Sequence, residues 1–287
     1  MYDAFYFQNG CGLPYERSEY WTRAFARMAD QIVAGIGPGS VLDAGCAMGF
    51  LVEALRDRGV EAYGCDISEY ALSQARADIR PFCWQASVLD PLPRRYDLIV
   101  CIEVLEHLPP ADAPQAVANF CEHADEVLFS STPSDFRETS HVNVRPVEYW
   151  AELFARHNFF RDVDFDATFI LPWSARFRRM NEPVASITRN YERKFWWMQN
   201  QNHELREQLR LQTTALRSRI EQLETDAARR EHLLAEIRGS LSWRLLQVLG
   251  PIRRFAIPRG SRRERAALKV FGGQPKAPQP GHPAGQP

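Results

Sequence analysis

The stretch Val41-Leu42-Asp43-Ala44-Gly45-Cys46-Ala47-Met48-Gly49 decides the fold. Its first half is an apolar run, which predicts a buried strand that ends at an acidic residue. Its second half is a loop of small residues, and a helix is expected to follow over residues 49–58. Small residues let the backbone approach a ligand closely, and the start of a helix supplies unpaired N–H groups. The stretch therefore predicts a ligand site between a strand and a helix.

A second carboxylate follows at the end of the next expected strand, residues 61–65. This strand runs into Gly64-Cys65-Asp66. A carboxylate at this place in a parallel sheet typically accepts hydrogen bonds from both hydroxyls of an adenosine ribose. The expected ligand is therefore an adenosine-containing cofactor.

Strand-like and helix-like segments alternate from Ser40 to about Leu171, which is typical of a doubly wound α/β sheet. We expect a domain over residues 38–175, preceded by a helical lid over residues 1–37. The expected strands lie near 40–44, 61–65, 82–86, 96–102 and 126–131. The expected helices lie near 49–58, 69–78, 113–123 and 146–157, followed by a hairpin over 160–171.

The two acidic strand ends resemble motif I and the following acidic motif of class I S-adenosylmethionine (SAM)-dependent methyltransferases. The family pattern is Asp/Glu-x-Gly-x-Gly-x-Gly, and Ala47 replaces its middle glycine. A nicotinamide dehydrogenase would prefer G-x-G-x-x-G, which this loop does not supply. The resemblance covers about residues 38–171. It implies a Rossmann-like, seven-stranded methyltransferase sheet that binds SAM.

The resemblance also implies which residues contact SAM. Ser87 and Val88, after the third strand, should flank the adenine. Tyr96–Glu103 resembles motif IV, whose strand ends beside the transferable methyl group. The full expected set is Asp43, Ala44, Gly45, Cys46, Gly49, Asp66, Ile67, Ser87, Val88, Ile102 and Glu103, with Tyr15 and Arg17 closing over the cofactor. Arg17 would meet the methionine carboxylate, and the alternative is an ordinary surface arginine.

Candidate catalytic groups follow the fourth expected strand. Glu103-Val104-Leu105-Glu106-His107 puts two carboxylates and an imidazole within one helical turn, since positions i and i+3 share a face. The loop after the fifth expected strand carries His141, which can reach the same rim. Methyl transfer to a hydroxyl requires alignment and removal of a proton. His107, His141 and Glu103 are therefore the expected catalytic residues.

This E-x-x-E-H run with a later histidine resembles metal-dependent O-methyltransferases, notably the small-RNA 2′-O-methyltransferases and the ubiquinone-pathway O-methyltransferases. The resemblance implies that Glu103, Glu106, His107 and His141 hold a divalent metal, Mg²⁺ or Mn²⁺. In the alternative, no metal binds, these residues cap a helix and line the cofactor pocket, and His107 or His141 is the general base.

A long helix is expected over residues 184–238, because this segment lacks Pro and Gly and is rich in Glu, Arg, Gln and Leu. Leu209, Leu216 and Leu223 fall at heptad position d, with Ile220 and Leu234 at position a. The pattern predicts a coiled coil that forms a homo-oligomer. A single solvent-exposed helix is the alternative, although it would leave the leucine stripe uncovered.

The C-terminal part is expected to be an amphipathic basic segment, residues 239–258, and a disordered tail, residues 259–287. Ser240–Leu246 with Pro251-Ile252-Arg253 resembles the C-terminal appendage of bacterial enzymes that build surface polysaccharide. This resemblance implies a sugar or glycan hydroxyl as acceptor, polysaccharide-assembly enzymes as partners and peripheral contact with the inner membrane. The alternative is a helical hairpin that packs against a partner.

Composition limits the remaining function classes. The six cysteines have no C-x-x-C spacing, and no apolar run is long enough to span a bilayer, so a reduced cytoplasmic location is expected. The expected catalytic domain lacks a dense basic patch, which argues against nucleic acid as a partner. A metal-dependent RNA ribose 2′-O-methyltransferase and a non-catalytic scaffold that presents the coiled coil remain the alternative functions.

Overall fold

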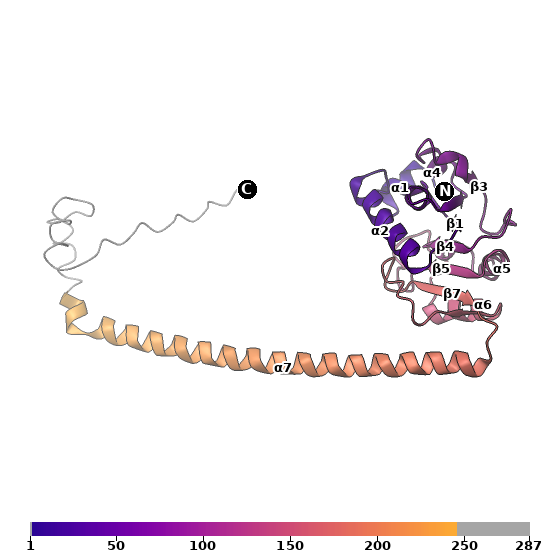
Figure 1. Ribbon diagram of the computed structural model, residues 1–287. Coiled ribbons are helices and arrows are strands. Elements are labelled where there is room, and N and C mark those ends of the chain that lie inside the picture. The colour runs from indigo at the N-terminus through magenta and orange to yellow at the C-terminus, as the bar shows by residue number, and fades with distance from the viewer. Residues whose placement is uncertain (1, 246–287) are drawn as a thin grey trace. The chain divides into compact units, whose positions relative to one another are not determined.

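The computed structural model of the protein describes residues 2–245 (Figure 1). The chain divides into two units, the first over Met1–Asn200 and the second from Gln201 onward. All the named strands and the helices α1–α6 lie in the first unit. The long helix α7, Val184–Gly239, begins in the first unit and continues in the second.

A seven-stranded sheet with the order β3-β2-β1-β4-β5-β7-β6 forms the centre of the first unit. The first five strands in this order pair in parallel, whereas β7 is antiparallel to both of its neighbours. This confirms the expected doubly wound α/β sheet. The strands are β1 Ser40–Ala44, β2 Glu61–Asp66, β3 Cys83–Gln85, β4 Leu98–Ile102, β5 Glu126–Ser130, β6 Phe159–Arg161 and β7 Ala175–Arg179.

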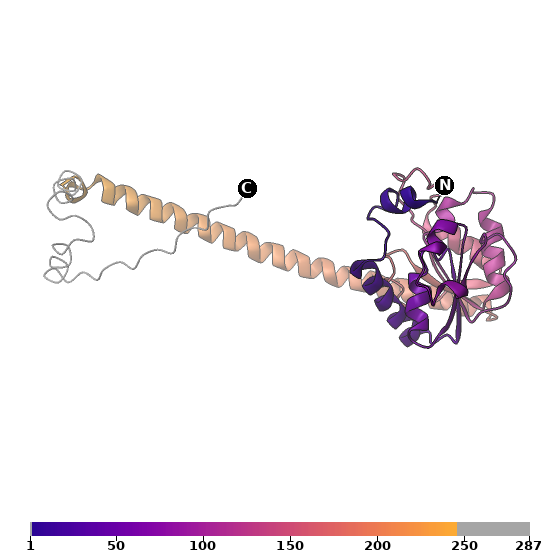
Figure 2. The same ribbon diagram turned by 90° about the horizontal axis from the view of Figure 1, so that it is seen from above.

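Helices cover both faces of the sheet, because alternate residues of each strand point to opposite faces. Along β4, Leu98 and Val100 pack toward one core, and Ile99 and Cys101 pack toward the other. The first core includes residues of α2 and α3, and the second includes residues of α5 and α6. Figure 2 shows helices on both sides of the sheet. The helices of the first unit are α1 Ala4–Asn9, α2 Glu19–Gly35, α3 Phe50–Arg56, α4 Glu69–Ser73, α5 Ala113–His123 and α6 Val147–Ala155.

Strand β1 lies between β2 and β4. The chain adds β2 and β3 on one side of β1 and then adds β4 and β5 on the other side. The carboxyl ends of β1 and β4 therefore form the point where the strand order reverses. Ligands of open α/β sheets bind in the crevice at this point. The fold thus directs the loops after β1, β2, β4 and β5 toward one edge.

The hairpin expected over residues 160–171 is wrong in its position. Its strands are β6 and β7, and Phe159 pairs with Arg179. The chain between them packs Phe165, Phe169 and Ile170 against the core beside α2 and α3. These apolar residues therefore belong to the long connection between β6 and β7 and not to the hairpin strands.

Helix α7 has 56 residues, which confirms the long helix expected there. Of its residues, Ile187 alone is buried. The leucines at the expected d positions are exposed, with Leu216 at 65% and Leu223 at 52%. No helix among residues 2–245 is both long and apolar enough to cross a membrane. Most of the expected basic segment and the whole expected tail lie outside the described residues.

Candidate active site

The loop after β1 is held in a conformation that favours glycine. Gly45, Ala47 and Gly49 all have positive φ angles, of 89°, 45° and 69°. A Cβ atom on Gly45 would lie 2.3 Å from a methyl carbon of Val104. The absence of a side chain at this position therefore lets the loop approach the start of the segment after β4.

Asp66 ties this loop to the end of β2. Its carboxylate accepts a hydrogen bond from the backbone N–H of Ala47 at 2.8 Å and another from Ser68 at 2.8 Å. Each carboxylate oxygen has a second lone pair, so the ribose hydroxyls of a cofactor can bind to the same group. Burial raises the pKa of Asp66 above its usual range. A carboxylate in this position fits the ribose role expected for Asp66.

Asp43 is buried at the end of β1, with 5% of its surface exposed. Burial and the nearby charge of Asp66 raise its pKa to about 8. A carboxyl group that is costly to ionise in the free protein would be stabilised by a cationic ligand. SAM carries a positive sulfonium and a positive amino group, so its charge suits this position.

The remaining expected cofactor residues surround the same edge. Ile67 is 49% exposed although it is apolar, which leaves a surface on which an adenine could pack. Val88 is buried, and the Ser87 hydroxyl accepts a hydrogen bond from the Leu89 N–H at 3.1 Å. Ala44 and Ile102 are the last residues of β1 and β4, and Cys46 is the second residue after β1. Ala44 and Cys46 are buried.

The N-terminal segment packs over the loop, as the expected lid would. The Tyr15 ring lies 5.3 Å from the Phe50 ring, centroid to centroid, and 5.9 Å from the Phe7 ring. Burial, with the charge of Asp43 in addition, raises the pKa of Tyr15. The expected role of Arg17 has no support in this geometry, because its guanidinium forms two hydrogen bonds with Glu53, at 2.7 and 2.6 Å.

The segment after β4 carries two carboxylates with different surroundings. Glu103 has a φ of 52°, in the left-handed region, and its Oε1 accepts a hydrogen bond from the Trp173 Nε1–H at 2.9 Å. Glu106 is fully buried, and its Oε2 has no hydrogen-bond partner among the described residues. Burial and the nearby Glu103 raise the pKa of Glu106 well above its usual range. Ser131 lies close enough to influence this carboxyl group, and a buried carboxylate oxygen of this kind can also bind a cation.

His107 and His141 meet beside Glu106, with their ring centroids 4.7 Å apart. The Nδ1 of His107 lies 3.3 Å from the Ser140 carbonyl oxygen, and the Nδ1 of His141 lies 2.9 Å from the Asp135 carbonyl oxygen. A carbonyl oxygen accepts, so each Nδ1 is the donor and Nε2 of the neutral ring keeps a lone pair. Ligand-type atoms of Glu106, His107 and His141 lie within 4.8 Å of one another.

Three of the four expected metal ligands therefore come together, whereas Glu103 does not belong to this group. Glu103 was expected on the same helical face as Glu106. The residues from Leu105 to His107 form a short 3-10 turn instead, and Glu103 precedes it with a left-handed backbone. Its side chain consequently turns toward Trp173.

Sequence reasoning missed Glu138. Its Oε2 lies 3.2 Å from the Nε2 of His141, and its Oε1 accepts hydrogen bonds from the hydroxyls of Tyr6 at 2.9 Å and Ser140 at 2.5 Å. Because the Nδ1 of His141 already donates, its Nε2 and the carboxylate face each other as two acceptors. Two acceptors that face each other in this way could bind a shared cation. Glu138 lies three residues before His141 in the sequence, and this spacing could have identified it. No pattern in the sequence pointed to Tyr6.

The N-terminal segment, Tyr2 together with helix α1, covers the imidazole of His107. The rings of Tyr2 and Tyr6 lie 5.7 and 6.3 Å from the His107 ring, centroid to centroid. This burial, together with the neighbouring His141, lowers the pKa of His107. His107 is consequently neutral at pH 7 and able to accept a proton or a metal ion.

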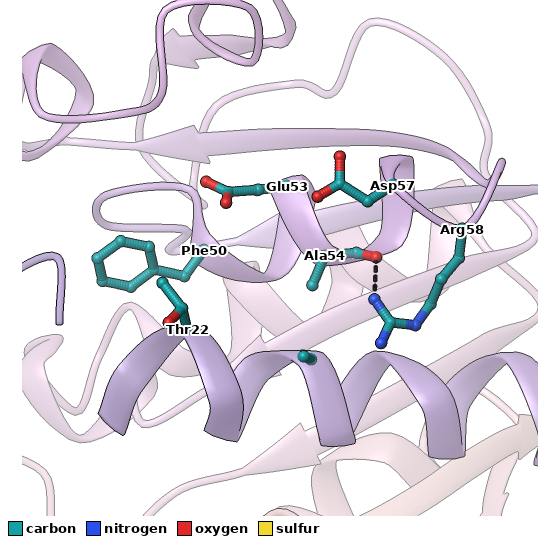
Figure 3. Close-up of a pocket in the computed structure, with 7 residues that line it drawn as sticks. Thr22, Phe50, Glu53, Ala54, Asp57 and Arg58 are labelled. Atoms are coloured by element: carbon teal, nitrogen blue, oxygen red, sulfur yellow. Dashed lines mark hydrogen bonds between the residues drawn. The ribbon is translucent and has the colours of Figure 1, made fainter. Parts of the chain in front are cut away.

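A cavity of about 190 Å³ lies between α2 and α3 (Figure 3). Its charged groups already have partners within the protein. Glu53 pairs with Arg17 at 2.6 Å and Asp57 pairs with Arg76 at 2.6 Å. Arg58 binds Asp30 at 2.7 Å and donates to the Ala54 carbonyl oxygen at 2.7 Å, as the dashed line in Figure 3 marks. This cavity is not a candidate for the reaction site.

Comparison with known proteins identifies the domain that contains the loop after β1. A family model described as a methyltransferase domain matches residues 15–170, more than half of the chain. The ubiquinone biosynthesis O-methyltransferase of Nitrosomonas europaea is 34% identical over 112 residues, which cover 36% of this chain and 47% of that protein. The same enzyme of Stutzerimonas stutzeri is 35% identical over 101 residues, which cover 32% of this chain and 43% of that protein. The chain thus spans slightly less than half the length of these curated relatives.

Among solved structures, magnesium protoporphyrin IX methyltransferase from Synechocystis PCC 6803 with bound SAH is 21% identical, with a TM-score of 0.44 over 54% of this chain and 81% of that chain. The family match spans the loop after β1, Asp66 and the acidic segment after β4. The chain therefore belongs to the methyltransferase domain family.

Proposed function

We propose that this methyltransferase transfers the methyl group of SAM to a hydroxyl oxygen. The observation that carries the proposal is the cluster of Glu106, His107 and His141 within 4.8 Å beside the cofactor loop. An alcohol must lose its proton as its oxygen attacks, so it needs a base or a cation at this position. Both are available from these side chains.

The protein's main task in this reaction is alignment. A bond forms between the acceptor oxygen and the methyl carbon while the bond from that carbon to the sulfonium sulfur breaks. The electron pair of the broken bond stays on sulfur, which gives S-adenosylhomocysteine (SAH), and the hydroxyl proton passes to a base. Because SAM already carries an activated methyl group, holding the two reactants in line provides most of the acceleration.

Glu106, His107 and His141 would hold a divalent cation, Mg²⁺ or Mn²⁺. The unpartnered Oε2 of buried Glu106 and the free Nε2 of His107 support this assignment. When bound, such a cation would lower the pKa of the acceptor hydroxyl and orient it. Glu138 lies against His141 and is a candidate for an additional ligand. Glu103 would not bind the cation. The hydrogen bond from Trp173 would instead hold its carboxylate toward the acceptor.

Without a metal, His107 is the preferred general base. Burial lowers its pKa, so the imidazole is neutral at pH 7. Its Nδ1–H donates to the Ser140 carbonyl oxygen, which leaves Nε2 to take the proton. The buried position of His107 therefore suits a general base as well as a metal ligand.

The resemblance of the C-terminal appendage predicts a sugar or glycan hydroxyl as the acceptor. It also predicts polysaccharide-assembly enzymes as partners and contact with the inner membrane. Of that appendage, Ser240 to Leu245 belong to the described residues. Trp243 donates its backbone N–H to the Ser240 hydroxyl at 3.2 Å, as at the start of a short helix. The basic residues from Arg253 onward lie beyond Leu245.

Chelation and one matched pair of variants test the hydroxyl proposal. The full chain is treated with EDTA and assayed for SAH with a panel of alcohols, phenols and glycosides. We expect at least a tenfold loss of activity that Mg²⁺ or Mn²⁺ restores. Glu106→Gln should weaken Mn²⁺ binding at least tenfold, measured by electron paramagnetic resonance, while Glu152→Gln, at an exposed position on α6, should not.

The outcomes separate the two mechanisms. Activity that survives chelation but is lost in His107→Asn would assign proton removal to His107 alone. SAM binding, measured by calorimetry, should persist in both variants, since neither residue belongs to the loop after β1. SAM binding without transfer to any hydroxyl acceptor, and with transfer to an amine, would refute the proposal.

A further inference from the structure

We propose that residues 205–238 of helix α7 pair with the same residues of a second copy of this chain, and that the two helices run antiparallel. This segment, the α7 seam, carries apolar side chains at most of its heptad positions a and d. These side chains are exposed, among them Leu209 at 64%, Ile220 at 54% and Leu234 at 49%. A long exposed apolar stripe marks a contact surface, and the charges beside it identify what binds there.

The apolar residues of the seam match one another when one of the two helices is reversed. In an antiparallel pair, each residue at position a faces a residue at position d of the partner. In one such register the facing residues are Ile220 with the partner's Leu223, Leu216 with the partner's Ala227, and Leu209 with the partner's Leu234. The pair has two-fold symmetry, so each contact occurs twice, once on either side of its centre.

Two arginines in the seam disfavour a parallel pair in register. A parallel pair would place Arg206 against the partner's Arg206 at position a. It would also place Arg230 against the partner's Arg230 at position d. Like charges that face each other inside a helix interface repel at low dielectric. In the antiparallel register, Arg206 faces the partner's Ile237 and Arg230 faces the partner's Thr213, so neither arginine meets a like charge.

The positions beside the seam, e and g, determine the orientation more directly. Between residues 210 and 231 these positions carry basic residues first and acidic residues afterwards: Arg210, Arg217 and Arg219, then Glu224, Asp226 and Glu231. Reversing one helix brings the basic half against the acidic half. The same antiparallel register then pairs Arg217 with the partner's Glu224, Arg210 with the partner's Glu231, and Arg219 with the partner's Asp226.

A parallel pair would not use these charges as well. In a parallel pair, position g faces the following position e of the partner. Arg219 would then attract the partner's Glu224, but Asp226 would repel the partner's Glu231. All the facing charges between residues 210 and 231 attract in the antiparallel pair, and charges at e and g select partner and orientation. The occupant that fits the seam is therefore a second, reversed copy of the seam itself.

The charged side chains are available for these contacts. Arg210 pairs with Glu207 of its own helix at 3.0 Å, but both side chains are about half exposed or more. Such exposed pairs contribute little and can exchange partners. In the antiparallel arrangement the Val184 ends of the two α7 helices point away from each other.

Disulfide cross-linking of the full chain tests the orientation. His203 and Arg238, both at position e, face each other across the antiparallel pair, whereas along one helix they are about 50 Å apart. We expect mixed His203→Cys and Arg238→Cys chains to cross-link in oxidised glutathione, while neither variant cross-links to itself. The wild type is the control, because its six cysteines all lie in the first unit. A His203→Cys chain that cross-links to itself, with no product in the mixture, would overturn the inference.

Charge reversal tests the complementarity that sets the orientation. Arg217→Glu alone and Glu224→Arg alone should each raise the Kd for self-association at least tenfold, measured by analytical ultracentrifugation at low salt. Mixing the two variants should restore association, because each new charge then faces its opposite. Arg229→Glu, at position c outside the seam, is the matched control and should have no effect.

The response of Arg217→Glu separates the two orientations. In a parallel pair Arg217 would face the neutral Gln212 of the partner, so its reversal would leave the Kd unchanged. Unchanged association of Arg217→Glu would therefore overturn the antiparallel assignment, as would a mixture of the two variants that stays dissociated. A wild-type chain that is monomeric at micromolar concentration would reject a second copy as the occupant of the seam.

Discussion

Ala47 occupies a backbone conformation that costs energy. Its φ of 45° lies in the left-handed region, where a side chain costs about 1–2 kcal/mol. Ala47→Gly should therefore leave the protein at least as stable, because the relieved strain offsets the greater freedom of glycine in the unfolded chain. Gly45→Ala should do the opposite and cost about 1–3 kcal/mol, since its Cβ would overlap Val104. Chemical denaturation of the two variants measures both effects, and a more stable Gly45→Ala would contradict the loop geometry.

Asp43 should make the free protein less stable as the pH rises. Its pKa is raised to about 8, mainly by burial, so the folded state holds a proton that the unfolded state releases near pH 4. The folded state binds more protons between these values, and the free energy of unfolding therefore falls from about pH 4 to pH 8. Asp43→Asn should flatten this slope in denaturation curves measured at pH 5, 7 and 9. If Asp43→Asn has the same slope of stability against pH as the wild type, the effect belongs to other groups, such as the neighbouring Asp66.

The N-terminal segment, Tyr2 together with helix α1, should set the pH range of activity because it covers His107. Replacing both Tyr2 and Tyr6 with alanine exposes the imidazole and removes the main cause of its lowered pKa. The pKa should rise toward about 6.5, so activity should be lost at a higher pH on the acid side. The pH profile of kcat/KM measures this shift. Tyr20→Ala, at an exposed position on α2, serves as the control and should leave the profile unchanged.

The elements that sequence could predict are those with a strong local pattern. Helix α5 begins and ends at the expected residues, and the strand, loop and helix around Asp43 follow the expected order. The position of β7 was missed because its pairing with β5 and β6 depends on distant residues. Glu103 and Glu138 show the same limit within the site. Their partners, Trp173 and Tyr6, are separated from them by 70 and 132 residues, so spacing alone could not bring them together.

At the scale of the whole molecule, the leucine stripe of α7 should hold copies of this chain together. Leu209, Leu216 and Leu223 are exposed at 64%, 65% and 52%, and burying each leucine against a second helix would contribute about 1.5–3 kcal/mol. Arg206, Thr213 and Arg230 interrupt the seam, so the association should be moderate.

Light scattering of the full chain should therefore give the mass of a dimer or higher oligomer, and the double variant Leu216→Lys and Leu223→Lys should give a monomer. Ser218→Lys, which adds a charge outside the seam, should leave the mass unchanged. SAM binding should survive in the monomer, because the cofactor loop and Asp66 lie entirely within the first unit. A wild-type chain that is monomeric at micromolar concentration would show that the stripe serves a different partner.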